Sequence, residues 1–296
     1  MKKLNEMKSR ILHARILRSV EALPLMSQSA SKLMRIADKN HSIRDVIEIV
    51  KYDPSLTIKI LQVVNSAAYG LSTPITSVER AIPHLGDRMV FGLAMEECAA
   101  PVYRDAMEGY EGESGSLWKH SLLTALTARE LAKVSVHKVM PEEAYTAGLM
   151  HDLGKGVLSQ YLKGSAPALL SAVENDSLRD YSEAELFFYG TDHCFVGYYI
   201  AKHWDLPEAL CEVIKFHHEP DKSRDEYKPL VYTVHVGDIM AMMGGAATGA
   251  DALMYEQDPR SEEFFEVQGK ELDSLMNEAL WEYRKIMEAM STEGPE

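Results

Sequence analysis

The feature that most constrains the fold is a helical spacing of apolar residues that recurs along almost the whole chain. In the segment 43–50, isoleucine and valine stand at i, i+3, i+4 and i+7, which is the pattern of one face of an amphipathic helix. Asp53-Pro54 offers an N-cap residue followed by proline at the first helical position, so another helix is expected to begin there. No persuasive run of alternating strand residues occurs. The sequence therefore predicts an all-α fold.

The charge of the chain limits its partners. Acidic residues number 45 and basic residues 31 among 296, which gives a formal net charge of −14. Such a field repels phosphate backbones and anionic lipid, so we expect neither nucleic-acid nor membrane binding. The uncharged stretch Ile239–Ala250 is too short to span a bilayer.

The cysteines and the N-terminus indicate in which cellular compartment the protein is expected. Cys98, Cys194 and Cys211 show no paired spacing, which argues against a disulfide framework and against a cysteine zinc site. Residues 1–15 are basic and lack a continuous apolar core, so they do not form a secretory signal. A cytoplasmic protein is expected.

One shift in composition suggests a boundary. Residues 104–116 are polar and rich in glycine, which predicts a linker or a long exposed loop. We divide the chain there into residues 1–112 and 113–296. In the first part, Asp53, Asn65 and Ser66 are interpreted as helix caps and packing residues, and no metal ligand is expected.

The second part places charged groups where a helix should be apolar. If 144–158 forms one helix, Asp152 shares a face with Tyr145 and Leu149, and His151 lies about 100° around the same helix. A carboxylate in a buried stripe is costly unless it is paired or bound to a metal.

The same anomaly recurs on other predicted helices. Imidazole or carboxylate groups occupy inward positions at His120, His193, His217, His218 and Asp238. One inward histidine is more often a hydrogen-bonded core residue than a ligand. Recurrence on separate helices favours a metal centre instead, and imidazole with carboxylate suits zinc, iron or manganese.

These residues carry a resemblance. The order His120, His151-Asp152 with Gly154-Lys155, and Asp238 resembles the H…HD…D signature of the HD superfamily of metal-dependent phosphohydrolases.

A second resemblance covers roughly Leu17 to Pro220. Segments 23–38, 50–86 and 184–220 are similar to the HDOD domain, with the motifs Asp-Pro…Asn-Ser-Ala…Tyr-Gly and Trp-x-Leu-Pro…His-His. This resemblance implies a regulatory role in bacterial signalling. It also implies a helical bundle in which an N-terminal HDOD subdomain packs on an HD-type metal-binding subdomain.

HDOD domains are usually regarded as HD relatives that have lost some ligands, whereas here every position is filled. The set matches the dinuclear arrangement of the related HD-GYP phosphodiesterases, and its metal-binding residues are His120, His151, Asp152, His193, His217, His218 and Asp238. The resemblance implies one or two divalent transition ions, iron, manganese or zinc, as the cofactor.

The resemblance also implies roles for single residues. The aspartate of the His-Asp pair, Asp152, bridges two metals in that family, and Lys155 could neutralise a phosphoryl oxygen. These two are the predicted catalytic residues, and the alternative for Lys155 is an ordinary solvated lysine. Asp192 and Glu219 are interpreted either as partners of imidazole N–H groups or as a helix cap and a surface charge.

Two departures count against cleavage of cyclic-di-GMP. The Gly-Tyr-Pro element is absent, because His218-Glu219 leads into PDKSRDEYKPL. Ser116 stands where some HD-GYP proteins carry a glutamate that binds a third metal. Two functions remain: a signalling regulator that works through protein partners, with a structural or sensory metal centre, or a phosphohydrolase (phosphodiesterase or nucleotide phosphohydrolase) acting on a phosphorylated small molecule.

Overall fold

The computed structural model describes residues 2–37, 41–66, 69–98, 102, 106–267 and 269–291. Over this part of the chain the regular secondary structure is helical, and the β-type contacts are isolated bridges between Met107 and Gly112 and between Ser135 and Phe265. The predicted all-α fold is confirmed. None of the helices described is both long and apolar enough to cross a membrane.

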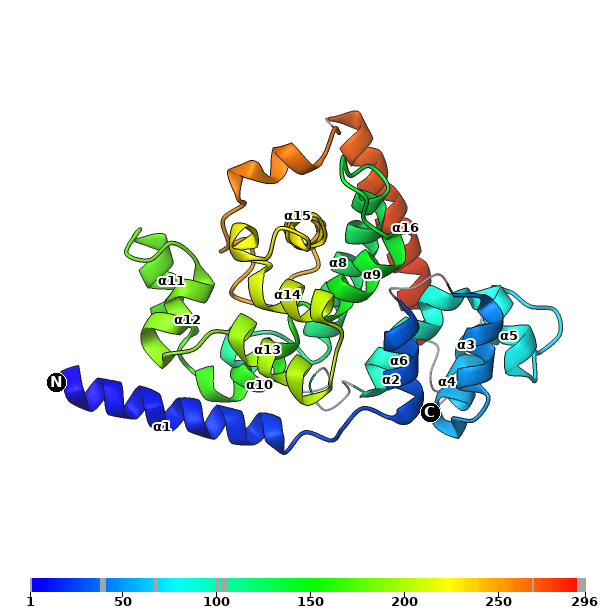
Figure 1. Ribbon diagram of the computed structural model, residues 1–296, viewed down its shortest axis with the longest axis horizontal. Coiled ribbons are helices and arrows are strands. Elements are labelled where there is room, and N and C mark those ends of the chain that lie inside the picture. The colour runs from blue at the N-terminus through cyan, green and yellow to red at the C-terminus, as the bar shows by residue number, and fades with distance from the viewer. Residues whose placement is uncertain are drawn as a thin grey trace.

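Five helices form a group at one end of the molecule (Figure 1). Asp53 caps one of them by accepting a hydrogen bond from the Leu56 amide. Asn65 follows the same helix, and its side chain both donates to the Ile75 carbonyl and accepts from the Ile75 amide. These two residues therefore act as predicted, as a cap and a packing residue. The group comprises α2 (Gln28–Ala37), α3 (Ile43–Val50), α4 (Pro54–Val64), α5 (Val78–Leu85) and α6 (Asp87–Cys98).

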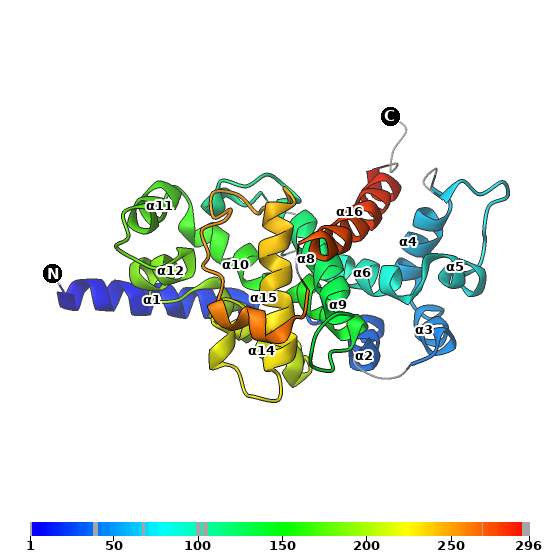
Figure 2. The same cartoon turned by 90° about the horizontal axis from the view of Figure 1, so that it is seen from above.

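The larger group is built around α8, which packs against α9, α15 and α16 (Figure 2). Nearly every residue of α8 is buried, because neighbouring helices surround it. The helices of this group are α8 (Ser116–Ala132), α9 (Pro141–Met150), α10 (Leu153–Leu162), α11 (Ala166–Glu174), α12 (Tyr181–Tyr189), α13 (His193–His203), α14 (Glu208–Phe216), α15 (Lys228–Met243) and α16 (Lys270–Ser291). Short 3₁₀ turns lie at η2 (Glu108–Tyr110), η3 (Pro220–Lys222) and η4 (Pro259–Phe264).

The first helix, α1 (Lys2–Glu21), packs mainly on the larger group. It contacts α10, α12 and α13, and runs beneath them in Figure 1. Ile16 and Val20 are buried in this contact, and the Ser19 and Tyr161 hydroxyls lie 2.6 Å apart.

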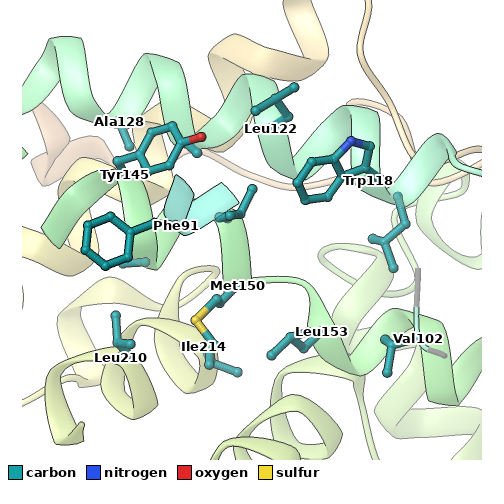
Figure 3. Packing of buried hydrophobic residues seen from close by; sticks show 14 of the residues in the cluster. Phe91, Val102, Trp118, Leu122, Ala128, Tyr145, Met150, Leu153, Leu210 and Ile214 are labelled. Atoms are coloured by element: carbon teal, nitrogen blue, oxygen red, sulfur yellow. The ribbon is translucent and has the colours of Figure 1, made fainter. Parts of the chain in front are cut away.

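One apolar core joins the two groups. Phe91 of α6 lies beside Tyr145 of α9, and Met150 at the end of α9 lies beside Ile214 of α14 (Figure 3). Because α6 contacts α9 directly, the N-terminal group is seated on the helices that carry the polar cluster.

The glycine-rich stretch is exposed only in part where the structure describes it, so the predicted exposed loop is wrong for the buried residues within 106–116. Met107 and Tyr110 are buried, and Met107 pairs with Gly112. A Cβ on Gly109 would lie 2.3 Å from the Ser159 carbonyl oxygen of α10. Glycine is needed here for close backbone packing, and not for flexibility. Residues 104 and 105 lie outside the described part.

Candidate metal centre

His151 and Asp152 occupy the junction between two helices. The helix α9 ends at Met150 and α10 begins at Leu153, so the continuous helix predicted over 144–158 is wrong. The chain turns at this dipeptide, and the Asp152 side chain does not cap the backbone amides at the start of α10. Its carboxylate therefore does not lie on the apolar face of α9, and it is surrounded by residues of other helices.

One carboxylate oxygen of Asp152 faces the first donor group, which comprises His120, His151 and Asp238. Asp152 Oδ2 lies 3.3 Å from His120 Nε2 and 3.4 Å from His151 Nε2. Asp238 Oδ1 lies 3.0 Å and 3.6 Å from the same two nitrogens. The helices α8, α9 and α15 thus bring four donor atoms to one point.

The other oxygen faces the second donor group, which comprises His193, His217 and His218. Asp152 Oδ1 lies 3.5 Å from both His193 Nε2 and His217 Nε2. His218 Nε2 lies 3.0 Å from His193 Nε2. All seven predicted metal-binding residues therefore meet, with Asp152 between the two groups.

Backbone carbonyls set the tautomers of three imidazoles. The Nδ1–H groups of His120 and His151 donate to the carbonyls of Ala246 and Gly148, at 2.9 Å and 2.7 Å. The Nδ1–H of His217 donates to Ile214 at 3.1 Å. Because a carbonyl can only accept, each Nδ1 carries a proton and each Nε2 faces the carboxylates.

The carboxylate oxygens lack conventional partners. Asp152 Oδ1 and Asp238 Oδ1 are buried and accept no hydrogen bond from the described residues. Imidazole lone pairs facing carboxylate oxygens at 3.0–3.6 Å repel unless a proton or a cation lies between them. The residues present therefore fit a divalent transition ion, whose preferred ligands are these atoms.

Without a metal ion, burial and neighbouring charges set the pKa values of the groups in the cluster. Burial raises the pKa of Asp152, but Lys155 and His151 outweigh it and hold that pKa well below the usual range. Burial lowers the pKa of His120, yet Asp152 and Asp238 raise it to about 10. Burial also lowers the pKa of His217 to about 4. The cluster thus holds ionised carboxylates with a proton on His120, and a metal ion would compete with that proton.

Lys155 is not the solvated lysine of the alternative interpretation. Its ammonium is buried and lies 2.8 Å from Asp152 Oδ2 and 2.7 Å from Asp251 Oδ2. Tyr255 donates a 2.8 Å hydrogen bond to the same Asp251 oxygen. Lys155 therefore links the bridging carboxylate to a second buried carboxylate.

Residues 246–258, which we call the closing segment, cover the cluster from the C-terminal side. The Ala246 carbonyl binds His120, and the Tyr255 ring stacks on His218 with centroids 3.9 Å apart. The Asp258 amide donates to Nε2 of His235, whose Nδ1–H donates to the His217 carbonyl. His235 thus has a structural role, because it links the closing segment to the His217 backbone.

A further carboxylate, Glu185, was missed. Its Oε2 accepts from the backbone amide and from the Nδ1–H of His193, at 2.9 Å and 2.7 Å, and its Oε1 accepts from the Tyr110 hydroxyl at 2.5 Å. Glu185 follows Tyr181 and Ala184 at helical spacing on the buried face of α12. A charged residue at an apolar position of a helix is the pattern that identified Asp238, and the same pattern predicts a buried Glu185.

Asp192 and Glu219 do not contact the imidazoles as hydrogen-bond partners. Asp192 accepts from the Phe195 amide and caps α13. Glu219 pairs with Arg179 and Lys222 at the surface. Asp192 is therefore a helix cap, and Glu219 is a surface charge.

Cys194 was not expected near the site. Its buried Sγ lies 3.6 Å from His193 Nε2 and 3.9 Å from each ring nitrogen of His217. Burial raises the pKa of this thiol to about 12, so it is neutral when no cation is present. Spacing between cysteines does not reveal a single thiol that lies beside a histidine cluster.

The cluster is closed to solvent. His218 is the most exposed of the seven residues, at 7%. A pocket of about 240 Å³ reaches the cluster only through His218. Its basic residues Arg179 and Arg260 are paired with carboxylates.

Comparison with known proteins agrees with this architecture. Residues 23–220 match the model of the HDOD domain family. An uncharacterised protein of Treponema pallidum (strain Nichols) is 26% identical over 264 residues, which are 88% of this chain and 49% of that protein. The chain thus spans about half the length of this relative.

Two solved structures share the fold. A Marinobacter aquaeolei VT8 protein named for signal transduction has a TM-score of 0.74 at 19% identity, over 96% of this chain and 65% of that one. A Shewanella amazonensis SB2B protein named as a phosphohydrolase has a TM-score of 0.64 at 20% identity, over 93% of this chain and 97% of that one. The matched range includes the His-Asp junction and the three histidines His193, His217 and His218, and the HD-type cluster fits the HD superfamily. On this match, the chain belongs to the HDOD domain family.

Proposed function

We propose that this chain is a regulatory HDOD protein of a bacterial signalling pathway. Its HD-type centre binds one or two ions of iron, manganese or zinc in a structural or sensory role. The observation that carries the proposal is Asp152, whose fully buried carboxylate faces a separate group of imidazoles with each oxygen. The division into residues 1–112 and 113–296 is part of the same proposal.

The two donor groups would hold the two ions. His120, His151, Asp238 and Asp152 Oδ2 would bind one, and His193, His217, His218 and Asp152 Oδ1 the other. Ions of this type supply Lewis acidity toward phosphoryl groups when they are bound. The residues of the chain fix the imidazole lone pairs, hold the carboxylates ionised and exclude water.

Closure of the centre favours regulation over turnover. The closing segment covers both donor groups, and the pocket that reaches His218 is acidic. An anionic phosphate would be repelled at this entrance. Its acidic residues outnumber its basic ones: Asp180, Glu219, Asp221, Glu256 and Asp258 against Arg179, Lys222 and Arg260. A bound ion would then act by holding the helices in the arrangement that protein partners recognise.

A second candidate is a metal-dependent phosphohydrolase. The bridging position of Asp152, with the Lys155 ammonium 2.8 Å from its Oδ2, favours this function. Lys155 would have to leave Asp152 or Asp251 to contact a phosphoryl oxygen of a small-molecule substrate. The missing Gly-Tyr-Pro element still counts against a cyclic dinucleotide.

Metal analysis tests the centre itself. Protein purified without chelator or metal-affinity tag should contain about one or two equivalents of transition metal. Asp152→Asn should lose most of it, because both groups lose a charged donor. Asp192→Asn is the matched control and should keep it, because asparagine also caps helices. Less than about half an equivalent in the unmodified protein would contradict the proposal.

Turnover assays separate the two functions. Fully metallated protein is offered a chromogenic phosphodiester, a phosphomonoester, nucleotides and cyclic dinucleotides, with iron, manganese or zinc supplied. We expect no turnover from the regulatory protein. Activity that disappears in both Asp152→Asn and His151→Ala would establish the phosphohydrolase instead.

A further inference from the structure

The Cys194 thiol lies inside the second donor group. Its Sγ, His193 Nε2, and donor atoms of His217 and His218 are all within 4.8 Å of one another, and all four residues are buried. The two contacts that matter most are Sγ to His193 Nε2 at 3.6 Å and His193 Nε2 to His218 Nε2 at 3.0 Å.

We propose that the Cys194 thiolate is a ligand of the metal ion bound by His193 and His218, which makes the second half of the centre a closed, zinc-selective site. This inference rests on the proposed function, because it assumes that an ion occupies the second donor group. It adds a ligand that the HD-type signature does not contain.

The spacing suits a shared tetrahedral ion. Zinc–nitrogen and zinc–sulfur bonds of about 2.0 and 2.3 Å place two nitrogens about 3.3 Å apart and a nitrogen and a sulfur about 3.6 Å apart. The observed separations around His193 are 3.0 Å and 3.6 Å. Sγ lies 3.9 Å from both nitrogens of His217, so its shortest contact with these imidazoles is the one to His193 Nε2.

An unpartnered carboxylate oxygen points into the same space. Asp152 Oδ1 is buried, accepts no hydrogen bond, and lies 3.5 Å from His193 Nε2. No donor among the described residues satisfies this oxygen. A cation between this oxygen, the thiol and the imidazoles would provide the missing positive partner for the oxygen and ligate the other groups as well.

The thiolate changes what the ion can do. His193, His217, His218, Asp152 Oδ1 and Cys194 fill the four or five positions that zinc accepts, and leave none for water or substrate. Sulfur also favours zinc over manganese, whereas the nitrogen and oxygen donors of the first group accept either ion. The two halves should therefore differ in metal selectivity.

Cobalt substitution tests the ligand directly. The full chain is depleted of metal and titrated with Co²⁺, and we expect near-ultraviolet absorption from thiolate-to-cobalt charge transfer. Cys194→Ala and Cys194→Ser should lose this absorption and bind zinc at the second group at least roughly tenfold more weakly, since even outer partners of metal ligands are worth about 10–100-fold. Cys211→Ala is the matched control and should keep both properties, because the buried Cys211 thiol donates to the Leu206 carbonyl.

The outcomes separate this inference from the proposed function. Cobalt binding without charge-transfer absorption would overturn the Cys194 ligand and leave the metal centre intact. No binding of Co²⁺ or Zn²⁺ at all would overturn the centre itself.

A measurement without variants covers the case in which they fail to fold. X-ray absorption at the zinc edge of the unmodified protein should show one sulfur at about 2.3 Å per zinc in the second group. A coordination shell of nitrogen and oxygen alone would refute the ligand.

Discussion

Single residues in this protein act through the partners they meet on other helices. Glu185 illustrates this, because one carboxylate orients His193 through both its amide and its Nδ1–H and is itself held by Tyr110. The hydrogen bond fixes the His193 tautomer, so that Nε2 remains free to bind an ion. A carboxylate that no sequence motif marks is therefore as important as the histidines that a motif does mark.

Glu185→Gln should weaken zinc binding roughly 10–100-fold, because an amide cannot accept all three hydrogen bonds and no longer supports the imidazole with charge. Competition with a chromophoric chelator measures the affinity. Glu183→Gln, on the same helix but bonded to the Arg179 amide, is the control and should bind zinc normally. Equal affinities of the two variants would show that Glu185 does not position His193.

At the scale of elements, helix contacts decide where the donors meet. Asp152 reaches His193 because α10 and α13 approach closely at Gly154. A Cβ at Gly154 would lie 1.8 Å from the His193 carbonyl oxygen and 2.5 Å from the Gly197 amide. The two backbones can come this close only because Gly154 lacks a side chain.

Gly154→Ala should therefore push α10 from α13, lower the free energy of unfolding by about 1–3 kcal/mol or more, and reduce the metal content. Denaturant unfolding and elemental analysis measure the two effects. Gly92→Ala should cost less, because the nearest atom to its Cβ is the Tyr145 hydroxyl at 3.1 Å. Full metal content in Gly154→Ala would mean that this contact does not position the centre.

An ion-pair network holds α16 on α8. Arg129 contacts Glu130 at 2.5 Å and Glu282 at 2.7 Å, and Lys133 also pairs with Glu130. Burial raises the pKa of Glu130, but Lys133 and Arg129 outweigh it and hold that pKa below its ordinary value of 4.5. A lowered pKa in the folded state stabilises the protein above the unfolded value, and this stability is lost as the pH falls through the folded value.

Glu130→Gln should therefore be less stable than the unmodified protein at pH 7, by about 1–3 kcal/mol. The difference should shrink as the pH falls below about 4.5, because the unmodified protein then loses the contribution of the charge. Urea unfolding of both proteins across this range measures it. A difference that does not change with pH would refute the role of the Glu130 charge.

At the scale of the whole molecule, the donors come from segments that lie far apart in the sequence. The helix α8, the α9–α10 junction, the start of α13, the end of α14 and α15 all meet at Asp152. The closing segment and α1 cover this arrangement from outside. A bound ion would thus link most of the larger helical group.

Removal of metal should lower the melting temperature of the whole protein. An ion at about 1,000 times its Kd stabilises the folded state by about 4 kcal/mol, which corresponds to a shift on the order of 10 °C. Calorimetry before and after chelation, with restoration by zinc, measures this shift. An unchanged melting temperature in protein shown to have lost its metal would indicate that the ion does not hold the helices together.

The sequence by itself determined the fold class and the set of polar residues that meet. Apolar spacing sets helix formation locally, and a histidine or aspartate at an apolar position must find a buried partner, wherever that partner lies. His120, His217 and Asp238 were recognisable for this reason. The family resemblance then assigned a common site to residues that periodicity alone could not connect.

Only the tertiary structure decided how that site is built. Neither residue of the turn at His151-Asp152 is a glycine or proline, so the sequence does not indicate a helix end there. This turn places the two oxygens of Asp152 next to different groups of histidines. The closing segment reaches the cluster through tertiary contacts with His218 and His120, which a local pattern does not encode. Residues 106–116 are polar in composition yet partly buried, because glycine permits close backbone contact as well as flexibility. Local spacing specifies which face of a helix turns inward, whereas the packing of all helices together specifies what that face meets.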